Sequence, residues 1–185
     1  MITARLVHAL RIPIIEYRTR AAALDRYAAG MAGPTDIETE FLFTLTARVG
    51  APFDIGELSQ GRRRISPIEG GEFDGPRLRG RVLPVTGDWM LIRPDGVTVI
   101  DVRATLQTDD GALIYMRYGG YRHGPKDVME ALARGEPVDP STYYFRITAS
   151  FETGAEGYSW LNQIVTVGTG RRDPGGPIYD LYEIL

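Results

Sequence analysis

The segment Asp101–Arg117, DVRATLQTDDGALIYMR, decides the fold class because it predicts two β-strands joined by a tight turn. Apolar and polar residues alternate along its first half, and this period of two is typical of a strand with two different faces. Asp110-Gly111 is a strong hairpin signal, since glycine takes the positive φ that such turns need. The segment therefore predicts an antiparallel β-hairpin.

The same hairpin suggests a binding surface. Asp101 and Arg103 share one face of the first strand, and Tyr115 and Arg117 share one face of the second. The hairpin could therefore bring a carboxylate, two guanidinium groups and a phenol onto one surface. Guanidinium groups bind planar carboxylates and similar oxyanions well, so this surface is a candidate site for a small organic molecule.

Strand patterns of the same kind run from Glu40 to the C-terminus and predict about eight to ten strands. A single helix is indicated among them, because Pro125 suits the first helical position and Gly135 the position after the end. Parallel βαβ units would need many more helices, so we expect the strands to be antiparallel. Many short strands with tight turns favour a barrel or a sandwich.

The polar faces favour the barrel. Several strands carry an apolar face and a second face of Arg, Asp and aromatic residues, and in a barrel wide enough to hold a ligand such a face can line the inside. We therefore predict a mainly β protein, an antiparallel β-barrel of the calycin or lipocalin type with one short internal helix. This domain is expected to span residues 38–185, with a strand at 158–167 and a turn region at 168–176.

Residues 1–37 differ in composition from the rest and are predicted to form an N-terminal extension, either helical or disordered. Tyr17–Ala29 is rich in Ala, Leu and Arg, which are good helix formers. Gly30 would end that helix. In the helical case the segment would dock on the domain or on a neighbouring subunit.

Composition excludes several functions. The 185 residues contain no cysteine and only two histidines, which excludes disulfides, thiolate catalysis and a His-rich metal site within one chain. The net charge of −3 argues against nucleic acid as the main partner. No apolar run approaches the ~20 residues of a membrane span, and no signal peptide is evident. We expect a cytoplasmic protein without metal or cofactor.

Several motifs resemble the DUF3237 family, also called UPF0311. The resemblance covers residues 38 to 185 and rests on these stretches, in chain order: Gly70-Gly-Glu-Phe-Asp-Gly-Pro-Arg-Leu-Arg-Gly-Arg-Val-Leu-Pro84, Gly87-Asp-Trp89, Thr108-Asp-Asp-Gly-Ala-Leu-Ile-Tyr115, Tyr144-Phe-Arg146, Phe151-Glu-Thr-Gly154 and Tyr158-Ser-Trp-Leu-Asn162. It implies a compact antiparallel β-barrel. It implies no particular reaction, because the family name marks a domain of unknown function.

Three carboxylates are candidate general acids or bases. Asp88 begins a strand beside Trp89, and a carboxyl partly buried against apolar rings could have a raised pKa; alternatively it caps a turn. Asp101 lies among guanidinium groups, either as part of a site or in a structural salt-bridge network. Glu152 borders a loop and is either catalytic or simply solvated.

Nine further residues are candidates for binding a substrate, because they combine flat aromatic surfaces with polar groups that can orient a ligand. For the aromatic members, ordinary core packing is the alternative interpretation. The nine residues are Trp89, Arg103, Tyr115, Arg117, Tyr144, Arg146, Tyr158, Trp160 and Asn162.

These residues predict a cofactor-independent enzyme that performs acid–base chemistry on a small organic molecule in a barrel pocket, of the lyase, isomerase or cyclase type. Two alternatives remain open at this point. One is a barrel that binds a small molecule without turning it over. The other is an interaction module whose exposed strand faces pack in a homo-oligomer. A homo-oligomer is expected in any of these cases, and no sequence feature identifies the substrate.

Overall fold

The computed structural model describes residues 36–185. The predicted N-terminal helix at Tyr17–Ala29 lies outside this part, so the prediction of a helical or disordered extension stays a prediction. The chain divides into two units after Ile37, and the description that follows concerns the second, Glu38–Leu185.

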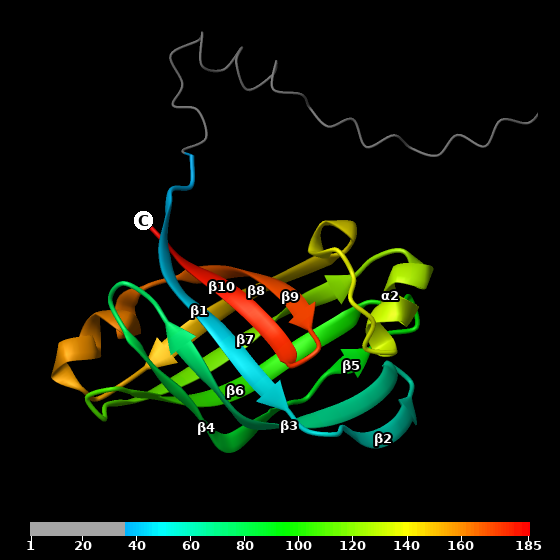
Figure 1. The fold of residues 1–185 in the computed structure, drawn as a ribbon, viewed down its shortest axis with the longest axis horizontal. Helices are drawn as coiled ribbons and strands as arrows, with labels where there is room; N and C mark the ends of the chain where they lie inside the picture. The colour runs from blue at the N-terminus through cyan, green and yellow to red at the C-terminus, as the bar shows by residue number, and fades with distance from the viewer. Residues whose placement is uncertain (1–35) are drawn as a thin grey trace, which may run out of the picture. The chain divides into compact units, whose positions relative to one another are not determined.

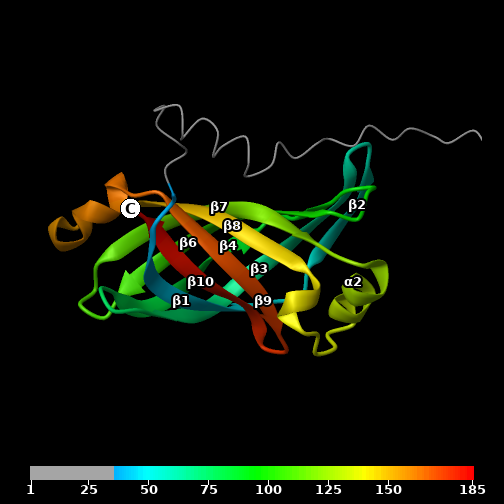
Figure 2. The same ribbon diagram turned by 90° about the horizontal axis from the view of Figure 1, so that it is seen from above.

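Eight antiparallel strands form a closed barrel (Figures 1 and 2). Their order around it is β1, β10, β9, β8, β7, β6, β4 and β3, and the ring closes because β1 pairs with both β10 and β3. The strands are β1 (Thr39–Val49), β3 (Gly61–Asp74), β4 (Arg79–Asp88), β6 (Thr98–Thr108), β7 (Leu113–His123), β8 (Tyr144–Glu152), β9 (Thr166–Asp173) and β10 (Gly176–Ile184). The predicted fold class is confirmed.

Two shorter strands extend one end of the barrel. β2 (Phe53–Leu58) forms a hairpin with the start of β3 and lies outside the closed ring. β5 (Leu91–Ile92) pairs with both β3 and β6. Together they lengthen the wall on the side where β7 ends.

The hairpin predicted from the sequence is formed by β6 and β7. Arg103 lies opposite Arg117, and Gln107 lies opposite Leu113. Gly111 in the turn has a φ of 91°, a conformation that other residues rarely adopt. The turn chemistry and the register therefore agree with the sequence pattern.

The direction of the strand faces differs from our expectation. Along β6 the apolar residues are buried and the polar residues alternate with them on the outer side, so Asp101 and Arg103 point away from the barrel interior. β7 and β8 show the same arrangement. Burial stabilises an apolar side chain by about 25 cal/mol per Å², whereas burial of an unpaired charge is costly. Most of the interior is therefore an apolar core, around Phe43, Phe73 and Leu106.

The glycine-rich segment near residue 170 is a strand, not the turn region that we predicted. β9 turns Gly168 and Gly170 toward the interior. A Cβ at Gly170 would lie 2.7 Å from the ring of Phe145 on β8, and a Cβ at Gly168 would lie 2.9 Å from Ile147. The glycines of β9 thus make room for the large side chains of its neighbour, and this requirement explains why a strand reads like a loop.

Helical segments lie at both ends of the barrel (Figure 1). The predicted internal helix is α2 (Lys126–Ala133), with Pro125 at its N-cap and Leu132 buried. η1 (Pro140–Thr142) leads into β8, and η2 (Glu156–Gln163) follows β8 at the opposite end. The strand predicted at 158–167 is wrong over most of its length, because 156–163 is helical. Within residues 36–185, no helix is long and apolar enough to cross a membrane.

Gly120 on β7 provides a test of the close strand packing. A Cβ at this position would collide with the backbone carbonyl of Arg146 on β8, which cannot move aside without distorting the sheet. We expect Gly120→Ala to lower the free energy of unfolding by about 2 kcal/mol, within the range seen for overpacked interiors. The urea midpoint of the purified variant measures this loss.

Gly154 is the matched control, because a Cβ there meets no atom within 4 Å. Gly154→Ala is expected to leave the urea midpoint nearly unchanged. Equal midpoints for the two variants would contradict the close approach of β7 and β8.

Candidate functional site

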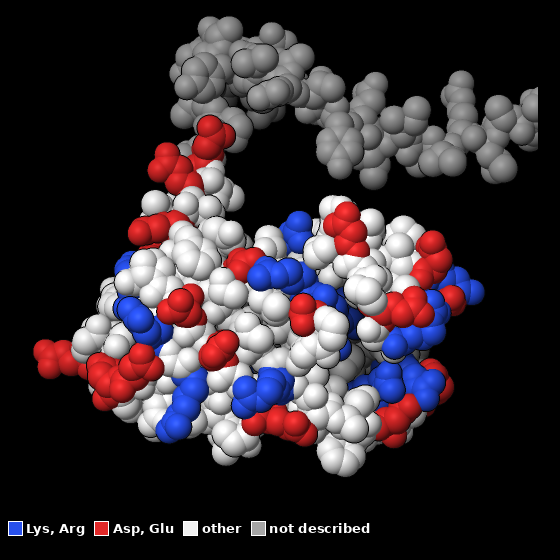
Figure 3. Space-filling view, in the orientation of Figure 1, with Lys and Arg blue, Asp and Glu red and all other residues white. Residues whose placement is uncertain are grey.

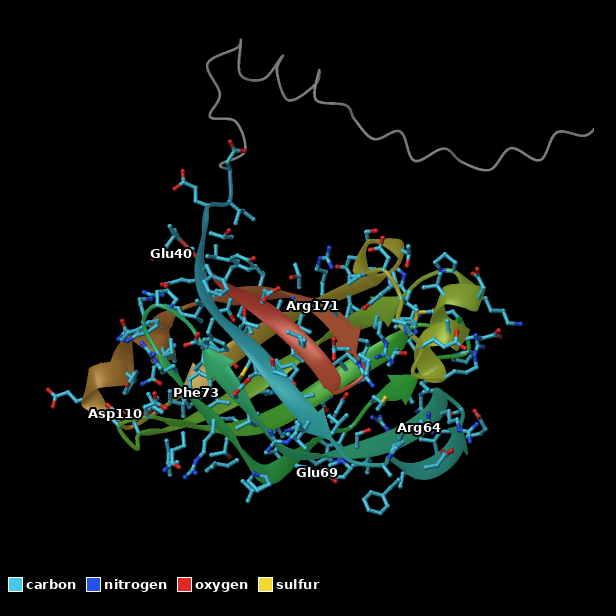
Figure 4. The ribbon with its side chains drawn as sticks, in the orientation of Figure 1. Glu40, Arg64, Glu69, Phe73, Asp110 and Arg171 are labelled. Atoms are coloured by element: carbon cyan, nitrogen blue, oxygen red, sulfur yellow. The ribbon has the colours of Figure 1, made fainter. Side chains whose placement is uncertain are left out.

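A cavity of about 1050 Å³ opens at the end of the barrel that carries α2. All eight strands of the barrel and the short strand β5 contribute to its walls, and α2 lies at its rim. Basic side chains lie at this end of the molecule, interspersed with Asp and Glu (Figure 3). Arg64 on β3 lies there, whereas Asp110 in the β6–β7 turn lies at the opposite end (Figure 4).

Asp88, the last residue of β4, places its carboxyl group in this cavity. It lies opposite Ser66 on β3 and Val102 on β6, both of which are buried. The backbone N–H of Asp101 donates a hydrogen bond of 3.2 Å to its Oδ1. Burial raises the pKa of Asp88 to about 6, although that hydrogen bond and the positive charges of Arg122 and Arg172 favour the carboxylate form. The group therefore gains and loses its proton near neutral pH.

Arg122 and Arg172 are the cations that face Asp88. Arg122 is the second last residue of β7, and Arg172 is the second last residue of β9. Both line the cavity. Burial lowers the pKa of Arg122, and the repulsion from Arg172 acts in the same direction. The backbone N–H of Arg172 donates a 2.9 Å hydrogen bond to the hydroxyl of Tyr143, which helps to fix the end of β9.

Two buried tyrosines form the deeper part of the site. Tyr118 on β7 and Tyr179 on β10 lie with their ring centroids 5.2 Å apart in an edge-to-face arrangement. Burial raises the pKa of both phenols, and the negative charge of Asp88 raises it further. Both phenols therefore remain protonated at neutral pH, and each can donate a hydrogen bond but cannot act as a base.

This arrangement can perform proton transfer. A carboxyl group that titrates near neutral pH can accept a proton from a bound molecule and return it at another atom. The guanidinium groups can stabilise negative charge that develops on an oxygen of the same molecule. Apolar side chains cover other parts of the wall and would contact a hydrocarbon or aromatic body; they include Ile100, Met129, Leu132 and Phe145.

Among the residues proposed from the sequence, Asp88 alone lines this cavity. Asp101 and Arg103 form a half-exposed ion pair of 3.0 Å on the outer wall. The Arg103 guanidinium lies over the ring of Trp89, 5.3 Å from its centroid. Because neighbouring residues of an extended chain point to opposite sides, Asp88 faces inward and Trp89 outward.

A groove on the outer wall collects several of the other candidates. It runs across β6, β7, β8 and β9, and Arg117, Tyr144 and Arg146 line it together with Asp101. Tyr115 and Glu152 lie outside this groove, opposite each other on β7 and β8, and both are exposed. The predicted gathering of a carboxylate with guanidinium groups therefore exists, but on the outer surface of the barrel.

The remaining three candidates lie on η2 at the far end and make contacts of a structural kind. The Tyr158 hydroxyl donates a hydrogen bond of 3.2 Å to Asp110. Arg77 lies over the Trp160 ring at 4.1 Å. The Asn162 side chain accepts from the N–H of Thr153 at 2.8 Å and donates to its carbonyl at 3.0 Å.

Most of the polar residues of the cavity and of the layer beneath it were not predicted from the sequence. A recognisable signal was present, since each of them falls in phase with the buried residues of its own strand or, for Tyr143, of the strand that begins at the next residue. Arg122 follows Ile114, Met116 and Tyr118 at intervals of two. A charged residue that continues an apolar face marks the place where that face reaches a cavity. The missed residues are Arg64, Ser66, Thr98, Tyr118, Arg122, Tyr143, Arg172 and Tyr179.

A metal centre finds no support in the part of the chain that the structure describes. No three side chains of His, Asp or Glu between residues 36 and 185 lie close enough together to hold a metal ion. The polar groups of the cavity are mainly guanidinium groups and hydroxyls, which suit an organic ligand better than a cation.

Comparison with known proteins identifies relatives over the whole barrel. The model of the family described as "Protein of unknown function (DUF3237)" matches residues 37–184. A UPF0311 protein of Rhodopseudomonas palustris is 42% identical over 149 residues, which are 80% of this chain and 97% of that protein. The resemblance noted from the sequence motifs is thereby confirmed.

Two solved structures support the fold. A β-barrel-like protein of Acinetobacter baumannii has a TM-score of 0.73 and 44% identity, covering 84% of this chain and 100% of its own. An enzyme from Penicillium herquei has a TM-score of 0.65 at 21% identity, covering 83% of this chain and 98% of its own. The second similarity is one of fold.

The raised pKa of Asp88 predicts a particular dependence of stability on pH. A carboxyl group whose pKa is higher in the folded state stabilises the fold at pH values below its unfolded pKa, and this contribution is lost as the pH rises through about 6. Asp88→Asn is therefore expected to become more stable relative to the wild type, by about 2 kcal/mol, between about pH 4 and about pH 7. Urea unfolding of both proteins across this range measures the difference. Parallel stability curves would contradict the burial of an ionisable Asp88.

Proposed function

The chain belongs to the DUF3237 family. From this premise we propose that it is a cofactor-independent enzyme that performs acid–base chemistry on a small organic molecule. The molecule is held in the cavity at the end of the barrel that carries α2. The observation that carries the proposal is the Asp88 carboxyl group, with a pKa near 6, inside a cavity that also contains Arg122 and Arg172. Catalytic groups are typically found in such perturbed environments within concave pockets.

Each residue has a proposed role. Above about pH 6 Asp88 is ionised and takes a proton from the substrate. Arg122 and Arg172 bind the oxygen on which negative charge develops, and this stabilises the transition state. Tyr179, which lines the cavity, donates a hydrogen bond deeper in the site, and Tyr118 packs against its ring. The protonated Asp88 then returns the proton at a different atom, an outcome that a lyase, an isomerase and a cyclase share.

Asp101 and Glu152 were also predicted to be catalytic, and their roles remain to be tested. Both side chains lie on the outer wall, so chemistry in the interior cavity requires Asp88 and requires neither of them. Of the three carboxylates, we therefore expect that replacing Asp88 abolishes activity, whereas replacing Asp101 or Glu152 leaves the protein active.

Turnover can be measured even though the substrate is unidentified. The wild-type protein is incubated in D₂O with a small-molecule extract of its own host cells, and mass spectrometry records which compounds change in amount or gain deuterium at carbon. We expect at least one such compound, since proton return from Asp88 labels the product. Asp88→Asn should lower the rate by about 10²- to 10⁴-fold, the usual contribution of a general acid or base.

Glu152→Gln is the matched control, because it removes a carboxylate from the exposed end of β8. This variant should retain the wild-type profile. Loss of turnover in Glu152→Gln with retention in Asp88→Asn would move the active site to the outer wall. Compounds that are bound but never altered would favour the second candidate function, a barrel that binds a small molecule without turnover.

The outer groove supports a homo-oligomer as a separate proposal. Tyr121, Tyr144 and Val165 line the groove and are 50%, 45% and 63% exposed, so much of the surface of each of these side chains is open to solvent. Burying them against a second copy would remove this surface from water. Sedimentation velocity of the wild type should show a species larger than the monomer, and Val165→Asp should convert it to monomer. A monomeric wild type would contradict the proposal.

A further inference from the structure

The cavity contains more positive charge than its own residues neutralise. Three arginines line it, each from a different strand: Arg64 from β3, Arg122 from β7 and Arg172 from β9. Within the described residues, none of the three forms an ion pair with a carboxylate. The Nε atoms of Arg64 and Arg122 are shielded from solvent and have no hydrogen-bond partner.

The carboxylates near the cavity do not compensate for these charges. Asp95 and Glu130 lie among the lining residues, but Asp95 is paired with Arg93, and Glu130 lies 3.8 Å from Lys126. Asp101 is paired with Arg103 on the outer wall. Asp88 is therefore the carboxylate that faces Arg122 and Arg172, and it carries at most one negative charge.

A shielded guanidinium N–H without a hydrogen-bond partner is unfavourable, because it loses its hydration and gains no hydrogen bond in exchange. The Phe145 ring, which lies 5.5 Å from the Arg122 guanidinium, supplies no such acceptor for it. The planar fork of an arginine side chain matches the two oxygens of a carboxylate or a similar planar oxyanion. A ligand that brings such a group would supply the missing hydrogen bonds and negative charge. The apolar wall formed by Met129, Leu132 and Phe145 would accommodate the rest of the ligand.

We propose that the substrate of this cavity is an organic acid, with a carboxylate or an equivalent planar oxyanion bound by Arg122 and Arg172 and an apolar body directed toward α2. This inference rests on the proposed function in that it concerns the same cavity. The inference differs from the proposed function in content, because the inference concerns the charge of the ligand and does not require that Asp88 transfers a proton.

Benzoate and benzamide form a suitable pair of probes, since they have nearly the same shape and differ in charge. Isothermal titration gives their dissociation constants, and the Nε–Hε resonances of the arginine side chains in an NMR spectrum show which guanidinium groups respond. We expect benzoate to bind the wild type at least tenfold more tightly than benzamide and to shift the Arg122 resonance. Equal affinities, or the absence of binding by benzoate at millimolar concentration, would overturn the proposal.

Arginine variants show which guanidinium groups bind benzoate. Arg122→Gln and Arg172→Gln should each weaken benzoate binding at least tenfold and leave benzamide unaffected. Arg171→Gln is the matched control, since Arg171 is adjacent on β9 but points outward and pairs with Asp180 (Figure 4). Equal loss in Arg171→Gln and Arg172→Gln would show that general surface charge, and not the cavity, attracts the anion. The comparison of the two probes on the wild type stands even if a variant fails to fold.

The pH dependence of benzoate binding gives a further test of the proposal. An ionised Asp88 repels an anion, so the affinity for benzoate should fall as the pH rises through about 6. The other charged groups around the cavity are His123 from β7, Lys126 and Glu130 from α2, Asp95 from the loop after β5, and the three arginines. Because histidine also titrates near this pH, the series is repeated in His123→Gln, where the fall should persist.

Asp88→Asn separates this inference from the proposed function. The variant should keep its preference for benzoate over benzamide, and its affinity should no longer decrease with pH. If Asp88→Asn retains turnover while the preference for benzoate holds, the catalytic role of Asp88 fails and the organic-acid inference stands. If Asp88→Asn loses turnover but the wild type binds both probes equally, the inference fails and the catalytic role stands.

Discussion

Closure of the sheet by β1 is the constraint on which the other features depend. β1 pairs with β10 along one edge and with β3 along the other, so a sheet that would otherwise end in two open edges becomes a ring. The contact with β3 requires Gly71, whose φ is 154° and where a Cβ would collide with the carbonyl of Thr46 on β1. An open sheet has two faces, whereas a closed ring has an inside and an outside. The period of two along each strand then decides which residues share the interior.

The polarity of the interior changes along the barrel axis, and this change produces the site. Its central part is filled by large apolar side chains such as Phe43 and Phe73, whose rings lie 5.5 Å apart. At the α2 end the same inward positions carry Asp88, Arg122 and Arg172. These charges lie between the hydrocarbon core and the cavity opening, so they are poorly hydrated, and electrostatic interactions among them are stronger than they would be at the surface. The raised pKa of Asp88 follows from this position.

The alternation of apolar and polar residues predicted the strands of the barrel, because this pattern is a property of each strand alone. The hairpin of β6 and β7 and the helix α2 could be predicted from the sequence for the same reason, because turn glycines and proline act locally.

The direction in which each strand face points, into or out of the barrel, was not a local property. It depends on how eight strands close, and the energetic preference for an apolar interior reversed the face that we had assigned to the ligand. Asp88 was found because it stands beside Trp89, although it ends β4 and does not begin a strand as we had predicted. Arg122 and Arg172 were missed because their significance depends on Asp88 of β4, which lies far from both of them in the sequence. Tyr158, Trp160 and Asn162 gave a strand-like pattern by chance within a 3₁₀ segment.

The rim formed by α2 is encoded differently from the rest of the cavity. The polar groups of the cavity wall come from strands distributed between Arg64 and Tyr179, and each of these strands is hydrogen-bonded to neighbours on both sides. The apolar rim at Met129 and Leu132 comes from a helix of eight residues without a side-chain hydrogen bond at its N-cap. Natural selection can therefore replace this short segment, and with it the shape of the entrance, while the hydrogen-bonded ring and its chemistry stay the same. Relatives that share the barrel would then diverge in the size of the molecule they admit through changes confined to one short insertion between β7 and β8, a modular route to new specificity that protein engineers can follow as well.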